Sequence, residues 1–240
     1  MFIEKRFEFG KVTVSDEETE EGTIRTLLVD GAQESACYVD EGMHFEPRFK
    51  YVAQFVKMLE ETDADRKVLL IGGGGFTIPK YFISRFDTGI LDVVELHRDM
   101  YDIAMKYFFL DELYAKYDPE KTGRLRVFFE DGNDYIDRCA SSADGMKYDL
   151  VLDDAFVGRV HDDGMLSERT ADRISRILAP GGRFAINLMT PAEGYGSMQA
   201  VLTVNILKNH FKDVKMRQVD PDRRPTERQN CIIRAASPIV

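Results

Sequence analysis

The sequence lacks the features that mark disulfide scaffolds, zinc proteins and membrane proteins. It holds only three cysteines, Cys37, Cys139 and Cys231, which lie far apart without a Cys-x-x-Cys pair or a histidine at ligand spacing. Neither a disulfide framework nor a zinc site is therefore expected. No apolar run approaches the about 18 residues that a membrane-spanning helix requires.

Positive charge is also scarce, and it is not concentrated anywhere. The formal net charge is −10, and the basic residues are scattered along the chain instead of forming a cluster. A nucleic-acid partner would require a basic patch, so none is expected. The first residues, MFIEKRFEFG, lack the cationic head and long apolar core of a signal peptide. We expect a cytoplasmic protein without a membrane or nucleic-acid partner.

What the chain has instead is a buried-strand pattern that runs into four consecutive glycines, within Lys67–Pro79. Val68–Ile71 is apolar without alternation, which is typical of a strand buried on both faces of a parallel sheet. Glycine has no Cβ, so the N–H groups can approach a ligand closely while the next helix directs its positive end at the same place. The stretch favours a nucleotide site at Gly72 to Gly74. Thr77 replaces the third glycine of G-x-G-x-x-G, so a turn without a ligand would fit too.

An acidic residue closes the second predicted strand. The run GILDVVEL contains Glu95, 21 residues beyond Gly74, and a carboxylate in this place accepts both hydroxyls of a ribose in nucleotide-binding folds. A glutamate that only faces solvent at a strand end is the alternative. Taken together with the glycines, Glu95 favours ribose binding.

Three more carboxylates stand at the ends of later strand patterns. RLRVFFE runs into Asp131-Gly132, and YDLVLDD ends with Asp153 and Asp154. Ligands of open α/β sheets bind at the carboxyl ends of the parallel strands. These side chains are therefore expected at the same edge of the sheet as the glycines.

Predicted helices alternate with the strands. A helical spacing of apolar residues follows Pro47, TIPKYFISRF must hold Pro79 in its first turn, and DMYDIAMKYFFL is amphipathic. SERTADRISRILAPGG predicts a further helix with a Pro-Gly-Gly stop, before the strand RFAINLMT. The alternation predicts an α/β fold with a doubly wound, Rossmann-like, mostly parallel sheet in residues 47–240.

The end of the chain separates two kinds of nucleotide fold. After the helical pattern SMQAVLTVNILKNHF, the strands DVKMRQVD and NCIIRAAS are joined by a polar loop without a helix, so they must be antiparallel. A dinucleotide dehydrogenase would continue with parallel crossovers. A parallel sheet closed by an antiparallel hairpin resembles that of the class I S-adenosylmethionine-dependent methyltransferases.

Residues 1–46 are expected to form a small β domain. FEFGKVTVS, TIRTLLVDG and SACYVDE are short runs rich in Val, Thr, Ile and Tyr, and the acidic SDEETEEG between them predicts a solvated hairpin loop. Small strands make a poor core alone, so this piece must pack on the larger domain or on a second copy of itself. We expect a homodimer.

Together these motifs resemble the spermidine/spermine synthase family, the polyamine aminopropyltransferases. The resemblance is carried by GGGG after a strand, Glu95, the Asp131-Gly132 turn, YDLVLDDAF and the LAPGG before the fifth strand. LLVDGAQES also resembles a segment in the small β domain of the family. The resemblance covers nearly the whole chain. It implies a transferase that uses decarboxylated S-adenosylmethionine, or S-adenosylmethionine, as co-substrate without a metal.

The resemblance also implies roles for individual residues. Those expected to bind the nucleoside are Gln33, Gly72, Gly73, Gly74, Glu95, Asp131 and Gly132. The glycines would surround its amino-acid end and Glu95 its ribose. Asp131 would hold the amino group of adenine, and Gln33 would lie near the sulfonium.

The acceptor is expected to be an amine. Asp154 would be the catalytic carboxylate that orients or deprotonates the attacking nitrogen, with Asp153 beside it in the acceptor site. Two other functions stay open. A methyltransferase would use the same nucleoside, and a nucleoside-binding protein could keep the site without turnover.

The chain departs from the family at the amine end of the site. The family carries an acidic residue in place of Gly75, a second aspartate in place of Val157, and a Tyr-His/Gln-Glu triplet in place of Phe49-Lys50-Tyr51. Each lost charge-assisted hydrogen bond would weaken the binding of a dicationic diamine by about 1.5 to 3 kcal/mol. Putrescine is therefore expected to be a poor acceptor, unless Asp162 and Asp163 fold over the pocket.

Overall fold

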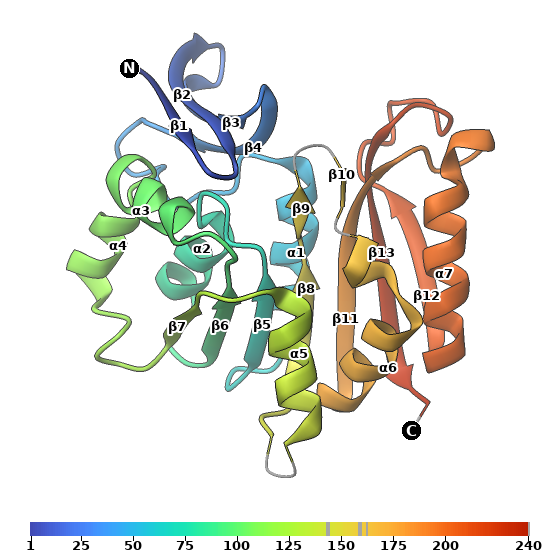
Figure 1. Ribbon diagram of the computed structural model, residues 1–240. Helices are drawn as coiled ribbons and strands as arrows, with labels where there is room; N and C mark the ends of the chain where they lie inside the picture. The colour runs from blue at the N-terminus through green and yellow to red at the C-terminus, as the bar shows by residue number, and fades with distance from the viewer. Residues whose placement is uncertain (143–144, 158–159, 162, 240) are drawn as a thin grey trace.

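The computed structural model describes residues 1–142, 145–157, 160–161 and 163–239, and its main element is a seven-stranded sheet (Figure 1). The strands are β5 (Lys67–Ile71), β6 (Ile90–Val94), β7 (Leu125–Phe128), β8 (Tyr148–Asp153), β11 (Leu178–Thr190), β12 (Phe211–Gln218) and β13 (Gln229–Pro238). Their order across the sheet is β12-β13-β11-β8-β5-β6-β7.

The direction of the strands follows the predicted pattern. The strands from β11 to β7 in the sheet order are parallel, whereas β13 is antiparallel to both β11 and β12. Residues 219–228, all described, hold no helix, so β12 and β13 form the antiparallel hairpin. The predicted doubly wound α/β fold with this closing hairpin is confirmed.

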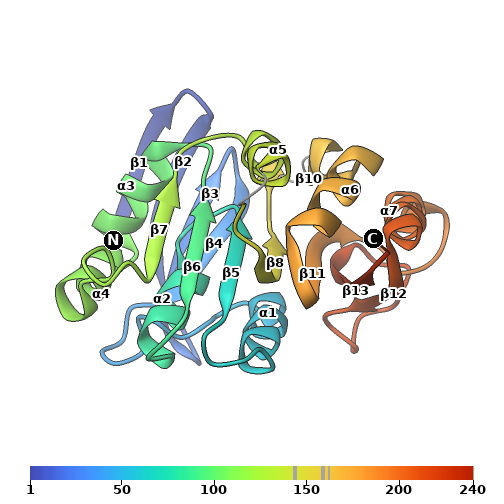
Figure 2. The same cartoon turned by 90° about the horizontal axis from the view of Figure 1, so that it is seen from below.

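Helices cover both faces of the sheet (Figure 2). In the described part of the chain they are α1 (Lys50–Glu60), α2 (Thr77–Arg85), α3 (Arg98–Tyr107), α4 (Leu110–Tyr117), α5 (Gly132–Ser141), α6 (Glu168–Ile177) and α7 (Met198–His210). Apolar residues of α1 to α4 belong to one core cluster, and those of α5 to α7 belong to the cluster on the other face. None of these helices is long and apolar enough to cross a membrane.

Local sequence accounts for several helix boundaries. The Ser167 hydroxyl accepts a hydrogen bond from the backbone N–H of Thr170 and so caps α6. Pro79 lies in the first turn of α2, as predicted. Backbone N–H groups of the first turn make no hydrogen bond within the helix, so a proline, which has no N–H, is tolerated there. The sequence patterns did not predict α4 and α5, which the structure shows as two further helices.

A second, four-stranded sheet is built by the N-terminal part of the chain. Its antiparallel strands, in sheet order, are β1 (Phe2–Phe7), β2 (Gly10–Thr19), β3 (Gly22–Val29) and β4 (Ala32–Tyr38). The run FEFGKVTVS spans two strands, because a turn at Glu8 and Phe9 divides it. The boundary between the two predicted domains at residues 46 and 47 and the homodimer stay predictions.

The sequence predicted that the acidic segment SDEETEEG forms a loop, and this prediction is wrong, because most of the segment is strand. Strand β2 continues to Thr19, and only Glu20 and Glu21 form the turn. The reason is pairing across the strands: the guanidinium of Arg25 in β3 donates to both carboxylate oxygens of Asp16, at 2.7 and 2.9 Å. This hydrogen bonding to Arg25 lowers the pKa of Asp16.

The small sheet packs on the larger α/β part instead of standing alone. Val14 and Leu27 of the small sheet and Phe55 of α1 belong to one core cluster. Arg25 of β3 ties the small sheet to the end of α3, because it donates to the carbonyl of Tyr107 at 2.7 Å. The fully buried Lys80 of α2 donates to the neighbouring carbonyl of Phe108 at 2.6 Å. Carbonyls at the carboxyl end of a helix favour such cations.

Between β8 and α6 lies a short irregular segment. The described elements in it are β9 (Phe156–Val157), which pairs with β10 (Val160–His161), and a 3₁₀ turn at Asp163–Leu166. Asp162, one of the two aspartates that could fold over the pocket, lies outside the described residues. A second 3₁₀ turn, Tyr195–Ser197, leads into α7.

Candidate active site

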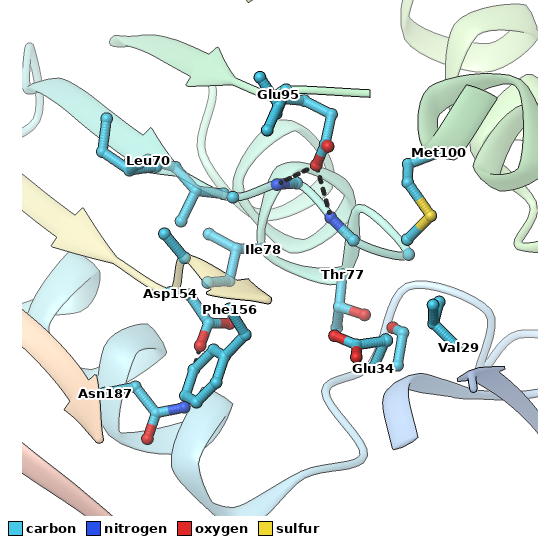
Figure 3. Close-up of a pocket in the computed structure, with 18 of the residues that line it drawn as sticks. Val29, Glu34, Leu70, Thr77, Ile78, Glu95, Met100, Asp154, Phe156 and Asn187 are labelled. Carbon is cyan, nitrogen blue, oxygen red and sulfur yellow. Dashed lines mark hydrogen bonds between the residues drawn. The ribbon is translucent and has the colours of Figure 1, made fainter. Parts of the chain in front are cut away.

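A cavity of about 680 Å³ opens at the carboxyl ends of β5, β6 and β8. Its walls come from the ends of these strands, from β4 of the small sheet and from the start of α1. Figure 3 shows Glu34, Glu95, Asp154 and Asn187 around it, delivered by four different elements. This is the edge at which open α/β sheets bind their ligands.

The glycine loop, Gly72–Gly75, joins β5 to α2 and has little room for side chains in its first half. A Cβ at Gly72, where φ is +88°, would lie 2.6 Å from the carbonyl oxygen of Asp154. A Cβ at Gly73 would lie 2.6 Å from the ring of Phe76. The glycines therefore let the loop pass between the end of β8 and the start of α2.

The second half of the loop lies beneath β4. A Cβ at Gly75 would lie 2.3 Å from the hydroxyl oxygen of Ser35. At Gly74, where φ is +50°, the nearest atom beyond the chain neighbours would be the carbonyl oxygen of Glu34, at 3.8 Å. Gly74 is thus the loop position with open space beside it, as close approach of a ligand requires.

We expect Gly75→Asp to destabilise the protein, although it introduces the acidic residue that the resembling enzymes carry. Overpacking against Ser35 should cost about 1 to 3 kcal/mol of unfolding free energy, measured by urea denaturation. The double variant Gly75→Asp, Ser35→Gly should recover part of this loss, because it removes both the hydroxyl and the Cβ. A single variant as stable as the wild type would contradict the packing described here.

Glu95 holds the glycine loop from below. Its Oε2 accepts hydrogen bonds from the N–H groups of Gly73 at 2.9 Å and Gly74 at 3.3 Å, and its Oε1 accepts from the N–H of His97 at 2.9 Å. The residue is 7% exposed and lines the cavity. The carboxylate that the sequence assigned to a ribose therefore also fixes the loop.

Glu95→Gln is expected to weaken nucleoside binding by about 1 to 3 kcal/mol. The amide has one accepting oxygen, so its NH₂ must face either the loop N–H groups or the N–H of His97, donor against donor. Calorimetry with methylthioadenosine measures the affinity, and urea denaturation of the same variant shows whether it is folded. Unchanged affinity in a folded variant would remove Glu95 from the nucleoside site.

Asp154 is fixed at the opposite side of the cavity by two donors. The hydroxyl of Tyr51 donates to Oδ2 at 3.0 Å, and the side-chain amide of Asn187 donates to Oδ1 at 2.9 Å. Asn187 is held in turn by the amide of Asn230 at 3.0 Å. Burial, and then the negative charge of Asp154, raise the pKa of Tyr51 far above its usual value, so the phenol stays protonated and keeps donating.

The sequence analysis missed Tyr51, because it counted Phe49-Lys50-Tyr51 only as a lost triplet. The pattern that could have found it is the helical spacing, since Tyr51 lies four residues before Phe55 and packs edge-on against its ring, with centroids 6.1 Å apart. Lys50 points away and donates to Asp220 at 3.0 Å. It adds no positive charge to the cavity.

Glu34 is the second residue that sequence patterns missed. It is half-buried, lines the cavity, and its Oε1 is buried without a hydrogen-bond partner in the described residues. Burial, together with the negative charges of Asp154 and Glu95, raises the pKa of Glu34 to about 7. The pairing of β3 with β4 shifts between Leu27 and Leu28, so that Glu34 falls in a bulge that no sequence pattern predicted.

Of the remaining predicted site residues, all but one line the cavity. Gln33, Asp131 and Gly132 line it. Asp131 also caps α5, because its Oδ1 accepts from the N–H of Asn133 at 2.8 Å. Asp153 is fully buried and does not line the cavity, so the structure does not bring it to the predicted acceptor site.

The charge of the cavity wall is strongly one-sided. The carboxylates that line it are Glu34, Glu95, Glu130, Asp131 and Asp154. Among the described lining residues, Arg228 is the one lysine or arginine, and its Nε donates to the carbonyl of Met189 at 3.0 Å. Such a wall favours a cationic ligand. In the described ranges, no three His, Cys, Asp or Glu side chains are grouped as a metal ion would require.

Comparison of the sequence with known proteins finds no matching family model. Among curated relatives, the polyamine aminopropyltransferase of Vibrio vulnificus (strain CMCP6) is 23% identical over 193 residues, covering 80% of this chain and 60% of the relative. That of Prochlorococcus marinus (strain MIT 9313) is 26% identical over 188 residues, covering 77% and 59%. The chain thus spans about three-fifths of the length of these relatives.

Solved structures show the same fold. A probable spermidine synthase from Corynebacterium glutamicum ATCC 13032 matches with a TM-score of 0.77 at 18% identity, covering 98% of this chain and 80% of the other. Human methyltransferase-like protein 13 in complex with SAH matches with a TM-score of 0.64 at 18% identity, covering 79% and 83%. The named relatives and neighbours are transferases. In sequence and fold, this chain is spermidine-synthase-like, built on the fold of the class I S-adenosylmethionine-dependent methyltransferases.

Proposed function

We propose that this protein is a transferase that binds decarboxylated S-adenosylmethionine or S-adenosylmethionine and transfers an alkyl group, of the aminopropyl type, to an amine. The observation that supports this best is the position of Asp154, held by Tyr51 and Asn187 in the same acidic cavity as the glycine loop. A sulfonium nucleoside is a cation, so an acidic wall suits the donor as well as the acceptor.

The nucleoside would lie along the carboxyl edge of the sheet. The glycine loop would lie along its amino-acid end and Glu95 beside its ribose, and Asp131 stands beyond the end of β7 for the adenine. The N–H groups of Gly73 and Gly74 already donate to Glu95, so the loop would contribute close backbone approach at Gly74 more than free donors. A spermidine synthase in complex with the transition-state analogue AdoDATO has the same fold, with a TM-score of 0.66 at 17% identity over 99% of this chain and 74% of the other. That likeness supports a nucleoside in this place.

The chemistry needs positioning and one proton acceptor. The positive sulfur withdraws electrons from the adjacent carbon, and a neutral amine attacks that carbon. The carbon–nitrogen bond forms as the carbon–sulfur bond breaks, and the sulfur takes the electron pair and leaves as a neutral thioether. The nitrogen is then positively charged and gives its proton to a carboxylate, a role that we assign to Asp154.

The acceptor side of the cavity favours an amine with an apolar body. Phe49, Tyr51, Val52 and Met189 are among the residues that line it. Phe156 lines it too and lies beside Asp154 in Figure 3. Apolar and aromatic walls stabilise methylene or ring groups but lack the charge-assisted hydrogen bonds that a carboxylate would give a second ammonium. We therefore place a monoamine with an apolar body ahead of putrescine as the acceptor. Lys50 does not repel a cationic acceptor here, because its side chain points away and donates to Asp220.

The experiment is a product assay on the intact chain. The protein is incubated with decarboxylated S-adenosylmethionine or with S-adenosylmethionine, plus putrescine or an apolar monoamine, and mass spectrometry identifies the products. We expect methylthioadenosine and an aminopropylated amine, with a putrescine kcat/KM below about 10⁴ M⁻¹s⁻¹. Methylated product with S-adenosylhomocysteine would overturn aminopropyl transfer in favour of a methyltransferase. Binding of the nucleoside without any product would overturn the enzymatic function.

A further inference from the structure

We propose that Glu34 selects the decarboxylated nucleoside over S-adenosylmethionine itself. This inference rests on the proposed function and adds to it the identity of the donor. The two nucleosides differ in one group, because S-adenosylmethionine carries a carboxylate beside its ammonium, whereas the decarboxylated form carries the ammonium alone. A protein carboxylate near that end would attract the decarboxylated nucleoside and would repel the carboxylate of S-adenosylmethionine.

The placement of Glu34 follows from the contacts of β4 with the glycine loop. A Cβ at Gly74 would lie 3.8 Å from the carbonyl oxygen of Glu34, and one at Gly75 would lie 2.3 Å from the hydroxyl of Ser35. Residues 34 and 35 therefore lie directly over the loop that leads into α2, which begins at Thr77. In Figure 3 the carboxyl group of Glu34 is drawn at the cavity on the side of Thr77.

This position matters because the start of a helix stabilises a negative charge. The N–H groups of the first turn and the helix dipole would favour the carboxylate of a bound amino acid. Here the carboxylate of Glu34, a group of the protein itself, lies near the start of α2. A donor carboxylate in the same region would meet a like charge, whereas an ammonium would gain an ion pair.

The groups that act on Glu34 strengthen the discrimination. The charges that bear on it are the carboxylates of Asp154 and Glu95, and Tyr51 faces it as a protonated phenol that already donates to Asp154. Arg228, the one lysine or arginine in the described lining, is engaged with the carbonyl of Met189 between β11 and β13. The charges that act on Glu34 itself are thus negative, and Arg228 is the one lysine or arginine in the described lining that could offer a donor carboxylate a positive charge.

The unpaired oxygen of Glu34 also predicts a proton effect. Because the pKa of Glu34 is about 7, the group is partly protonated in the free protein at neutral pH. An ammonium binds its ionised form, so the decarboxylated nucleoside should release a fraction of a proton per site at pH 7. Preference for the decarboxylated form should rise as pH increases from about 6 to 8, since the carboxylate becomes charged over that window.

The main test compares two variants that remove the same charge from the cavity wall. Affinities for decarboxylated S-adenosylmethionine, S-adenosylmethionine and methylthioadenosine are measured at pH 8 for Glu34→Gln and for the control Glu130→Gln, whose carboxylate pairs with Arg138 at 2.5 Å. Glu34→Gln should reduce the preference for the decarboxylated form by about tenfold or more, as expected for a lost charge-assisted hydrogen bond. Glu130→Gln removes a charge from the same wall, but one already paired with Arg138, so it should change the preference much less, by about twofold at most.

Methylthioadenosine separates the possible failures, because it lacks both charged groups and should bind all three proteins equally. If it binds but Glu34→Gln leaves the preference intact, the role of Glu34 is wrong and the proposed function stands. If it binds none of them, the proposed function itself fails. Calorimetry at pH 7 in two buffers of different ionisation enthalpy adds a second readout: the wild type should release protons on binding the decarboxylated form and Glu34→Gln should release none. Equal proton release by both would also overturn the role of Glu34.

Discussion

Replacing Asp154 with asparagine is expected to slow alkyl transfer by about 10²- to 10⁴-fold, the contribution of a positioned proton acceptor, while nucleoside affinity changes little. The amide has the shape of the carboxylate but cannot take the proton of the attacking amine. It also has one accepting oxygen for two donors, so its NH₂ would face either the hydroxyl of Tyr51 or the amide of Asn187. The measurement is the rate of thioether release at saturating nucleoside and acceptor.

Tyr51→Phe is the matched control, because it removes one donor and keeps the carboxylate. We expect a smaller loss of rate, about tenfold, corresponding to one hydrogen bond to a charged group. If the Asp154→Asn variant kept its rate within about threefold of the wild type, Asp154 would be a structural residue and another group would have to take the proton.

The largest effect on stability is expected for Asp92→Ala in β6, a residue that does not line the cavity. Asp92 is fully buried, and the guanidinium of Arg126 donates to both of its oxygens at 2.5 and 2.6 Å. The hydroxyls of Tyr148 and Tyr135 donate to Oδ2 at 2.7 and 3.2 Å. This network ties together β6, β7, β8 and α5 around one carboxylate.

Removing the carboxylate leaves a cation and two phenols without their acceptor. Because the Arg126 side chain is 37% exposed, water would partly hydrate the charge left behind, and we expect a loss of about 2 to 4 kcal/mol of unfolding free energy, less than for a fully buried pair. Tyr135→Phe, which removes the hydroxyl contacts with Asp92 at 3.2 Å and with Tyr148 at 2.7 Å but leaves the ion pair, should cost about 1 to 2 kcal/mol. Urea denaturation measures both, and a loss below about 1 kcal/mol for Asp92→Ala would contradict the importance of the network. Nucleoside affinity of the folded Asp92→Ala fraction should stay unchanged, because the network does not line the cavity.

The arrangement of the large sheet was predictable because its physical causes lie in short stretches of sequence. Val68–Ile71 has no polar residue, and only a strand covered on both faces tolerates that. The loop between β12 and β13 is too polar to form a buried crossover helix, which leaves an antiparallel pairing as the remaining connection.

The acceptor side of the site was less predictable, because it depends on contacts between distant segments. Tyr51 reaches Asp154 across 103 positions of the chain. Glu34 enters the cavity through a bulge, and a bulge reverses the alternation on which a prediction of strand faces depends. The different positions of Asp153 and Asp154 have a simpler cause, since neighbouring residues at a strand end point in different directions. Of Asp153 and Asp154, only the second lines the cavity.

The capping role of Asp131 shows a further limit of motif reading. The Asp-Gly pair was interpreted as a turn that presents a carboxylate, and the same residue turned out to begin helix α5. Both uses are compatible, since Oδ1 accepts from the N–H of Asn133 while the residue lines the cavity. Its predicted contact with the adenine amino group stays a prediction.

The acidic cavity between β4 and the carboxyl edge of the large sheet should bind a sulfonium nucleoside. Isothermal titration of decarboxylated S-adenosylmethionine into the intact protein tests it most directly. We predict saturable binding of one nucleoside per chain, tighter than that of S-adenosylmethionine and weakened by Glu95→Gln. A folded protein that shows no saturable binding of decarboxylated S-adenosylmethionine, S-adenosylmethionine or methylthioadenosine would contradict the account.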